Sequence, residues 1–292
     1  MFGFRLIGRL AARVMDTLWR SFPPIVRIET TNRCNAACTF CPHLSMQRET
    51  GVMDQALYEK LVMECTQGGC RTLHLHNFGE PLLDPDLAER IAFAKDAGMR
   101  RVKIFTNGSL LSGERAERLL GSGLDEIKIS IDGRDAEEFA RLRKGLSLDM
   151  ILDNTRRFRA MRDKTAAKRR PTIIAACTQT SDRGATDRFL SSVVDRTDYG
   201  ELHNWGGIMN PLQGRRIRKP CSRVWQTFTV LWNGDVALCC LDYDGSEILG
   251  NVREKPIRQV WQEERYQAIR RLHRLSEQDA IPLCQDCSKS FY

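Results

Sequence analysis

Residues 25–41 read IVRIETTNRCNAACTFC. The apolar run at its start follows Pro23 and Pro24, and it predicts a short buried strand that leads into a cysteine loop. In that loop three cysteines, Cys34, Cys38 and Cys41, stand within eight positions. Thiolates are the usual ligands of iron–sulfur clusters, and three ligands on a four-iron cluster leave one iron open. Since an open coordination site distinguishes a catalytic metal from a structural one, the stretch predicts a catalytic cluster.

Composition supports metal binding over disulfide bonding. The chain has 292 residues, of which 42% are hydrophobic and 28% charged, as in a globular protein with one large or two unequal domains. Eleven cysteines would indicate a disulfide scaffold in a short secreted chain. Here they are spread through a long sequence without a convincing signal peptide, so we expect metal ligands and a cytoplasmic location.

The net charge of +8 does not indicate a nucleic-acid partner, because the basic residues are interleaved with 37 acids and not gathered in blocks. We interpret this charge as a solvated surface that helps with an anionic substrate. No stretch approaches the roughly 20 apolar residues of a membrane-spanning helix.

Residues 1–24 predict an amphipathic helix, because apolar residues recur near helical spacing and arginines lie between them. The apolar positions are Phe2, Leu6, Leu10, Val14 and Leu18, and the basic ones are Arg5, Arg9, Arg13 and Arg20. Two interpretations stay open: peripheral membrane contact through residues 1–20, or a helix that closes the bottom of a barrel. The second is favoured, because such helices commonly face a core.

Further short strands alternate with helical patterns. β-Branched and apolar residues predict strands at 72–76, 102–106, 126–131 and 172–177. Asp54 and Asp86 are placed to begin helices between them. About six such units end near Trp205, and alternation of this kind is typical of parallel βα units. We therefore expect an α/β fold with a partial (β/α)6 barrel over residues 25–210.

The sequence pattern changes from Pro211 onward, from alternating strands and helices to closely spaced short strands. The basic stretch Arg215 to Lys219 resembles a linker, and Asn233-Gly234 between strands at 227–231 and 236–238 is a strong hairpin signal. A helix is expected from about Pro256 to Leu275. Residues 211–292 are therefore predicted to form a second domain, a small β-hairpin plus helix.

The spacing of Cys34, Cys38 and Cys41, with aromatic Phe40 before the third cysteine, resembles that of the radical S-adenosylmethionine superfamily. The resemblance implies that the methionine part of S-adenosylmethionine chelates the open iron of a 4Fe-4S cluster. Reductive cleavage then gives a 5'-deoxyadenosyl radical that abstracts hydrogen from substrate. A zinc site is the alternative, but three cysteines without a histidine partner pattern are a poor zinc motif.

Other segments resemble the cofactor contacts of the same superfamily. Asn77-Phe78-Gly79-Glu80-Pro81 is similar to the GGEP segment, of which Gly79 and Glu80 carry over. Arg143 resembles the arginine that neutralises the cofactor carboxylate, with Arg141 close enough to compete. The resemblance implies a cofactor-binding set of Phe40, Gly79, Glu80, Thr106, Asn107, Ser130, Asp132 and Arg143.

A second set of thiols follows in the C-terminal region: Cys221, Cys239, Cys284 and Cys287. With the hairpin, this pattern resembles the twitch domain, a shortened SPASM domain that holds one auxiliary 4Fe-4S cluster. Four thiolates make a closed site, so the cluster is expected to accept or pass one electron. A tetrathiolate zinc site is the alternative, because spacing alone does not choose between the metals.

Four cysteines remain. Cys65 and Cys70 are expected to be buried as small hydrophobes. Cys177 and Cys240 are candidate hydrogen-atom donors. Epimerases of the superfamily finish their reaction when a cysteine donates a hydrogen atom to the substrate radical.

The resemblance implies a radical enzyme that needs a flavodoxin or ferredoxin-type reductant. Size and cysteine spacing are most similar to those of a twitch dehydrogenase, so our first hypothesis is two-electron oxidation of a small polar substrate, a sugar or cyclitol. Epimerisation is the second hypothesis, peptide modification the third, and a non-enzymatic iron–sulfur or zinc protein the last. His203, Asn204 and Trp205 are candidates to line a polar pocket.

Overall fold

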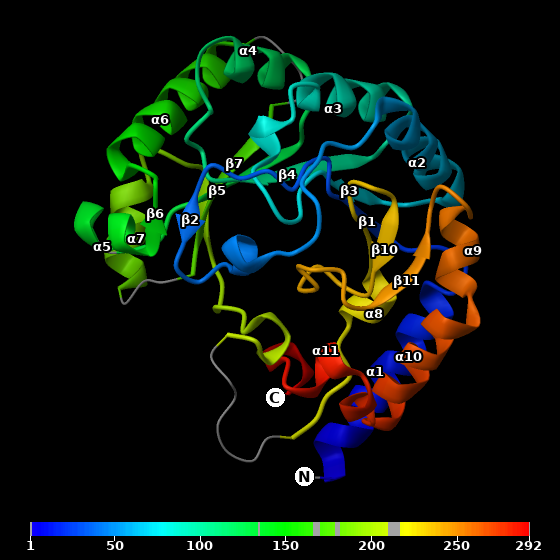
Figure 1. Cartoon of the computed structure of the whole chain (residues 1–292). Coiled ribbons are helices and arrows are strands. Elements are labelled where there is room, and N and C mark those ends of the chain that lie inside the picture. The colour runs from blue at the N-terminus through cyan, green and yellow to red at the C-terminus, as the bar shows by residue number, and fades with distance from the viewer. Residues whose placement is uncertain (1, 134, 166–169, 179–181, 210–216, 292) are drawn as a thin grey trace.

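The computed structural model describes residues 2–133, 135–165, 170–178, 182–209 and 217–291. Six parallel strands form the body of one sheet (Figure 1). They are β1 (Ile25–Ile28), β3 (Thr72–His74), β4 (Arg101–Thr106), β5 (Glu126–Ser130), β7 (Thr172–Cys177) and β8 (Arg196–Tyr199). The predicted α/β fold with six strand units is confirmed.

Helices lie around the outer side of these strands (Figure 1). They are α2 (Gln55–Gly68), α3 (Leu87–Asp96), α4 (Gly113–Gly121), α5 (Ala136–Leu142), α6 (Leu148–Lys164) and α7 (Arg183–Leu190). Asp54 caps α2 as predicted, since its carboxylate accepts a hydrogen bond from Leu57 N at 2.8 Å. Asp86 stands at the start of α3, but its side chain makes no capping hydrogen bond to that helix.

The strands separate an apolar face from a polar one. In β4, Val102 and Ile104 belong to the hydrophobic core, whereas Lys103 and Phe105, which alternate with them, are only half-buried. Successive side chains of a strand point to opposite faces, so the core residues face the helices. We call the other side of the sheet the inner face; Arg27, His74 and Lys103 lie in register on it.

The C-terminal region continues the same sheet. Strand β9 (Thr227–Val230) pairs in parallel with β1, and β10 (Asp235–Ala237) and β11 (Ile248–Asn251) follow in antiparallel order. The predicted hairpin is confirmed, and Gly234 at its turn has φ +97°. The expected boundary at 210 and 211 lies outside the described residues, as does the linker before Ile217.

The helix expected over 256–275 is two helices. These are α9 (Ile257–Gln262) and α10 (Glu264–Leu275), separated at Glu263, whose backbone is extended with φ −61° and ψ 151°. Short elements complete the fold. They are β2 (Ala37–Cys38), β6 (Arg143–Lys144), α8 (Arg223–Gln226), α11 (Pro282–Gln285) and the 3-10 turns η1 (Pro42–Ser45), η2 (Pro81–Leu83), η3 (Trp205–Gly207), η4 (Gln278–Ala280) and η5 (Ser288–Ser290).

The N-terminal helix, α1 (Phe2–Leu18), is confirmed, and its principal contacts are with α10 and α8. Asp16 forms an ion pair with Arg274 and accepts a hydrogen bond from Trp225 Nε1. The carbonyl of Trp19 accepts a hydrogen bond from Trp261 Nε1 at 2.9 Å. The helix therefore packs against the C-terminal helices and not across the strands. In the described part of the chain, no helix is both long and apolar enough to span a membrane.

The burial pattern makes a direct prediction for stability. Phe158 of α6 is fully buried, whereas Phe189 of α7 is 54% exposed. We expect Phe158→Ala to lower the free energy of unfolding by about 3–5 kcal/mol, because it leaves a cavity in the core. Phe189→Ala, the same chemical change on the surface, is expected to cost less than about 1 kcal/mol. Urea titrations followed by circular dichroism measure both, and equal losses would contradict the packing described here.

Candidate active site

A short two-stranded sheet joins the cysteine loop after β1 to the segment that follows α5. Strand β2 pairs with β6, which places Cys38 opposite Arg143, and Thr39 N donates a hydrogen bond to the carbonyl of Leu142 at 2.9 Å. Cys34 and Cys41 are half-buried, and burial raises the pKa of each thiol to about 11. A metal that binds here must therefore displace the thiol protons.

The donor set fits a cluster better than a single ion. Among the described residues, no three His, Cys, Asp or Glu side chains converge closely enough to hold one metal ion. Around one zinc ion, sulfurs bound at about 2.3 Å would crowd together. In a four-iron cluster each cysteine binds a different iron, so the sulfurs stay further apart. Cys34, Cys38 and Cys41 supply three thiols, the donor type that such a cluster takes.

Next to the loop, Glu80 is itself buried and is held in a hydrogen-bond network. Its carboxylate accepts hydrogen bonds from Thr106 Oγ1 at 2.5 Å and Asn107 N at 2.7 Å. Asn107 Nδ2 then donates to Asn35 Oδ1 in the cysteine loop at 2.8 Å. Burial raises the pKa of Glu80 even though these donors oppose it. The structure thus brings together three of the predicted cofactor contacts at the ends of β3 and β4.

Gly79 lies against the backbone of Asn32 and Arg33, at the start of the cysteine loop. Its φ is +97°, and a Cβ atom there would stand 2.7 Å from the Asn32 backbone and 2.8 Å from the Arg33 carbonyl oxygen. Glu80 N donates a hydrogen bond to the same carbonyl at 2.7 Å. Glycine is required here both for conformation and for space.

Arg143 and Asp132 form a buried pair beneath the cysteine loop. Arg143 Nε donates to Asp132 Oδ2 at 2.8 Å, and its Nη1 approaches Cys38 Sγ at 3.7 Å. Its guanidinium lies over the ring of Phe40, 5.1 Å from the ring centroid. Arg141 instead is 70% exposed and pairs with Glu138. The geometry favours Arg143 over Arg141 near the predicted cofactor, and Ser130, buried, ends the neighbouring strand β5.

The second set of thiols surrounds one small cavity. It is lined by all four predicted cysteines, Cys221, Cys239, Cys284 and Cys287. Arg223 lines the same cavity, and the thiols of Cys240 and Cys239 raise its pKa above the usual value. A guanidinium beside several sulfurs is suited to a negatively charged metal–thiolate group. The fold therefore brings residues up to 66 positions apart, from Cys221 to Cys287, to the walls of one cavity.

An aromatic cluster connects the two sets of thiols. Trp205 Nε1 donates a hydrogen bond to the carbonyl of Phe40 at 2.8 Å, and its ring contacts Phe78 and His203. Behind it, a Cβ atom at Gly206 would stand 2.8 Å from Leu283 Cδ1, next to Cys284. Trp205 has φ +50°, a conformation that non-glycine residues rarely adopt. Its segment thus touches both the cysteine loop and α11.

Of the predicted pocket residues, His203 and Trp205 belong to this cluster, whereas the side chain of Asn204 bonds to the backbone near Cys287. Asn204 Nδ2 donates to the carbonyl of Asp286 at 2.6 Å, and its Oδ1 accepts from Ser288 N at 2.9 Å. It therefore fastens this segment to the chain around Cys287. Phe78 was not among the predicted site residues, although it directly precedes Gly79 in the sequence.

The two candidate hydrogen donors have different surroundings. Cys177 shares its face of β7 with Ile173 and Ala175, which face the helices, and it is 1% exposed in the hydrophobic core. Cys240 is half-buried; burial opposes its ionisation, but Arg27 and Arg223 lower the pKa of its thiol. The structure therefore gives Cys240 the more accessible position. Cys65 and Cys70 are buried in the core as expected.

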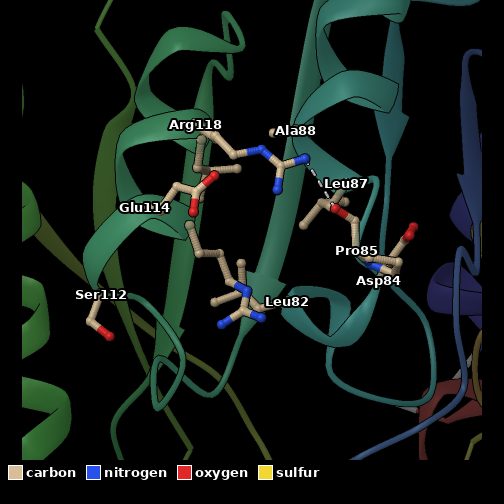
Figure 2. A pocket seen from close by; sticks show the side chains of 10 residues that line it. Leu82, Asp84, Pro85, Leu87, Ala88, Ser112, Glu114 and Arg118 are labelled. Atoms are coloured by element: carbon tan, nitrogen blue, oxygen red, sulfur yellow. Dashed lines mark hydrogen bonds between the residues drawn. The ribbon is translucent and has the colours of Figure 1, made fainter.

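A separate hollow lies on the outer helix layer, between α3 and α4 (Figure 2). It is lined by Leu82, Asp84, Glu114 and Arg118, among others, and Arg118 reaches across it to the carbonyl of Pro85. None of the cysteines lines it. This hollow is therefore not the candidate active site.

Gly79 supplies a test of the loop geometry with a matched control. Gly98 has nearly the same φ, +93°, but a Cβ atom there would meet nothing within 4 Å. Alanine at either position costs roughly 1–2 kcal/mol for the left-handed backbone, and only Gly79→Ala adds the collision. We expect Gly79→Ala to lose iron and sulfide from the purified protein, and Gly98→Ala to retain both. A fully loaded Gly79→Ala protein would contradict this geometry.

Two family profiles match the chain. The Radical SAM superfamily matches residues 28–166, which include Cys34, Cys38 and Cys41. An iron-sulfur cluster-binding domain, SPASM, matches residues 221–288, which begin at Cys221 and include Cys287.

Two curated relatives cover different parts of the chain. An S-adenosyl-L-methionine-dependent 2-deoxy-scyllo-inosamine dehydrogenase of Niallia circulans is 23% identical over 268 residues, which is 90% of this chain and 92% of the relative. A GTP 3',8-cyclase of Synechococcus sp. (strain CC9902) is 42% identical over 122 residues, which is 40% of this chain and 34% of the cyclase. Of these two, the dehydrogenase covers most of the chain and the cyclase less than half of it.

Solved structures share the fold. BtrN in complex with AdoMet and 2-DOIA has a TM-score of 0.66 at 21% identity, covering 91% of this chain and 93% of its own. SuiB of Streptococcus suis, bound to precursor peptide SuiA, has a TM-score of 0.70 at 16% identity, covering 89% and 71%. The chain therefore belongs to the radical S-adenosylmethionine superfamily, as an enzyme that uses S-adenosylmethionine and iron–sulfur clusters and carries a SPASM-type domain in its C-terminal region.

Proposed function

We propose that the enzyme oxidises a hydroxyl group of a small polar molecule, a cyclitol or sugar, by two electrons. The observation that carries this proposal is the cavity lined by Cys221, Cys239, Cys284 and Cys287. Four thiol ligands would close a cluster to substrate, and a closed cluster is suited to electron transfer. The dehydrogenase relative, whose match covers 90% of the chain, supports the same reaction.

The proposal assigns the ligands in two sets. Cys34, Cys38 and Cys41 would hold the first 4Fe-4S cluster, and the four C-terminal cysteines the second. Around S-adenosylmethionine we place Phe40, Gly79, Glu80, Thr106, Asn107, Ser130, Asp132 and Arg143. When bound, these groups supply a radical that abstracts hydrogen and an acceptor for one further electron. A flavodoxin or ferredoxin-type protein would deliver the electron that starts each turnover.

The chain itself must take up one proton. Oxidation of an alcohol removes one hydrogen atom from carbon, then one proton from oxygen and one electron. Burial lowers the pKa of His203 to about 4, with Arg223 adding to the effect, so its imidazole is neutral at pH 7. It is a weak base that would take the proton only as the electron leaves the substrate and the hydroxyl becomes acidic. Its Nδ1 is buried without a hydrogen-bond partner among the described residues. We assign the proton to this nitrogen.

Epimerisation is the second candidate function, and the position of Cys240 favours it. The thiol directly follows Cys239 of the second set and is half-buried, and the charges of Arg27 and Arg223 lower its pKa. A thiol there could return a hydrogen atom to a substrate radical. In that case the substrate would change configuration without net oxidation.

The decisive experiment offers cyclitols and sugars that carry deuterium on the carbinol carbon. We expect deuterium to appear in 5'-deoxyadenosine and a ketone to form in equal amount. Cys284→Ser should lower ketone formation per 5'-deoxyadenosine by roughly tenfold or more, because it removes a cluster ligand. Cys70→Ser, a cysteine of the core outside both sets, is the control.

The outcomes separate the two reactions. Solvent hydrogen at the substrate carbon, lost in Cys240→Ala while deuterium transfer persists, would establish epimerisation and overturn the dehydrogenase proposal. Zinc in place of iron, with no cleavage of S-adenosylmethionine, would overturn both.

A further inference from the structure

We infer that Arg27, on the inner face of the sheet, binds an anionic group of the substrate, a phosphate or a carboxylate. This inference rests on the proposed function, because it concerns the molecule that the same site takes. Arg27 lies in register with Thr229 on one neighbouring strand and His74 on the other. Its neighbours along the strand, Val26 and Ile28, are fully buried on the helix side.

Nearby cations on the inner face already have acidic partners, and Arg27 does not. Lys103 pairs with Glu126 at 3.0 Å, and Lys128 pairs with Asp198 at 2.5 Å. The nearest acid along β1, Glu29, is held by Arg48 through hydrogen bonds of 2.6 and 2.7 Å. Within the residues that the structure describes, no carboxylate forms an ion pair with Arg27.

The polar atoms around Arg27 are also incompletely satisfied. Its Nη2 approaches His74 Nδ1 at 3.4 Å, a long contact, and its Nε is buried without a partner among the described residues. His76 Nδ1, two residues along, is buried and unpartnered in the same sense. Buried polar groups in native proteins nearly always have partners, so an unpaired guanidinium N–H indicates a ligand that supplies oxygen atoms.

The surrounding histidines do not neutralise this charge. Burial lowers the pKa of both His74 and His76 well below the ordinary value, and the charge of Arg27 lowers it further. Both imidazoles are therefore neutral at pH 7 and add no positive charge beside the guanidinium. An ammonium group would be repelled from this position, whereas a phosphate or carboxylate would be attracted.

The position suits a substrate anchor. Glu29, two residues after Arg27, accepts a hydrogen bond from Phe78 N at 3.2 Å, and the Phe78 ring contacts Trp205, whose ring contacts His203. The strand that carries Arg27 therefore ends at the aromatic cluster that holds the candidate proton acceptor. An anion held here would leave the rest of a small molecule among these side chains. Arginine binds planar oxyanions through two parallel hydrogen bonds, which also fixes their orientation.

Binding to the cluster-loaded enzyme tests this inference without requiring turnover. Calorimetric titrations would compare inorganic phosphate, a myo-inositol phosphate, glucuronate and uncharged myo-inositol. We expect one anionic sugar or cyclitol to bind at least about tenfold more tightly than myo-inositol, and Arg27→Gln to weaken it by about tenfold to a hundredfold. The phosphate and glucuronate titrations show which anion is preferred. Arg118→Gln, on the outer helices, is the control with the same loss of charge.

Equal affinity for charged and uncharged probes, or no binding of either anion, would overturn the inference. So would unchanged affinity in Arg27→Gln together with a loss of iron, since Arg27 would then serve only the second thiol set. The deuterium experiment reports separately on oxidation, so anion binding without ketone formation would contradict only the proposed function.

A different observation supports a second inference: we propose that α1 binds an anionic lipid surface. Four large apolar side chains on this helix are exposed, Ile7 at 66%, Leu10 at 62%, Val14 at 50% and Leu18 at 64%. Their spacing of three and four residues aligns them in one stripe. The helix uses other positions, including Ala12, Met15 and Trp19, to pack on the protein.

Charge decides the kind of partner. Arg9, Arg13 and Arg20 on or directly after the same helix are exposed, and the chain as a whole carries +8. Leu275, at the end of the neighbouring helix α10, adds an exposed apolar side chain, and its carbonyl accepts a hydrogen bond from Arg9. An apolar stripe beside arginines is typical of helices that lie in the interface of anionic membranes.

Sedimentation with vesicles tests this second inference on the intact enzyme. We expect binding to vesicles of phosphatidylcholine with phosphatidylglycerol, and much weaker binding to phosphatidylcholine alone. Leu10→Asp should weaken binding by about tenfold or more, because it removes one buried apolar side chain. Phe189→Asp, an exposed apolar position on α7, is the control. If the enzyme does not sediment with vesicles, the inference is overturned and the stripe has no lipid partner. If instead the enzyme forms a dimer in solution that Leu10→Asp dissociates, the partner is a second copy of the chain.

Discussion

The two-residue alternation of the parallel strands is the constraint on which the rest of this structure depends. Each strand must bury one row of side chains under helices, as Val102 and Ile104 do. The side chains of the opposite row do not pack against the helices, and this row carries Arg27, His74 and Lys103. Chemistry can be placed on the inner face because stability is supplied from the outer one.

Both thiol sets are positioned by contacts between segments that are distant in sequence. The first is held by the pairing of Cys38 with Arg143 and by the network that joins Asn35 to Glu80. The second surrounds a cavity beside α11, against which the Trp205 segment packs. Trp205 also donates a hydrogen bond to the carbonyl of Phe40, in the cysteine loop. A displacement of either thiol set would therefore move the other through this one side chain.

Local signals predicted the strands well and the connections less well. The apolar runs at 25–28 and 172–177 match β1 and β7, because a short buried strand depends on its own residues. The break at Glu263 carried no glycine or proline signal, so one helix was expected where two occur. The cysteines were identified by spacing, whereas Arg27 and His74 were overlooked. A polar residue within an apolar run marks an inner-face position only when the register of the neighbouring strands is known.

The parallel pairing of β9 with β1 makes the C-terminal region inseparable from the rest. If a gene lost the sequence after residue 210, β1 would become the edge of the sheet, with unpaired backbone groups available to any other chain. Such a fragment would be prone to self-association through that edge. The C-terminal region thus supplies the backbone partner of the strand that leads into Cys34, and it shields that strand from pairing with other chains.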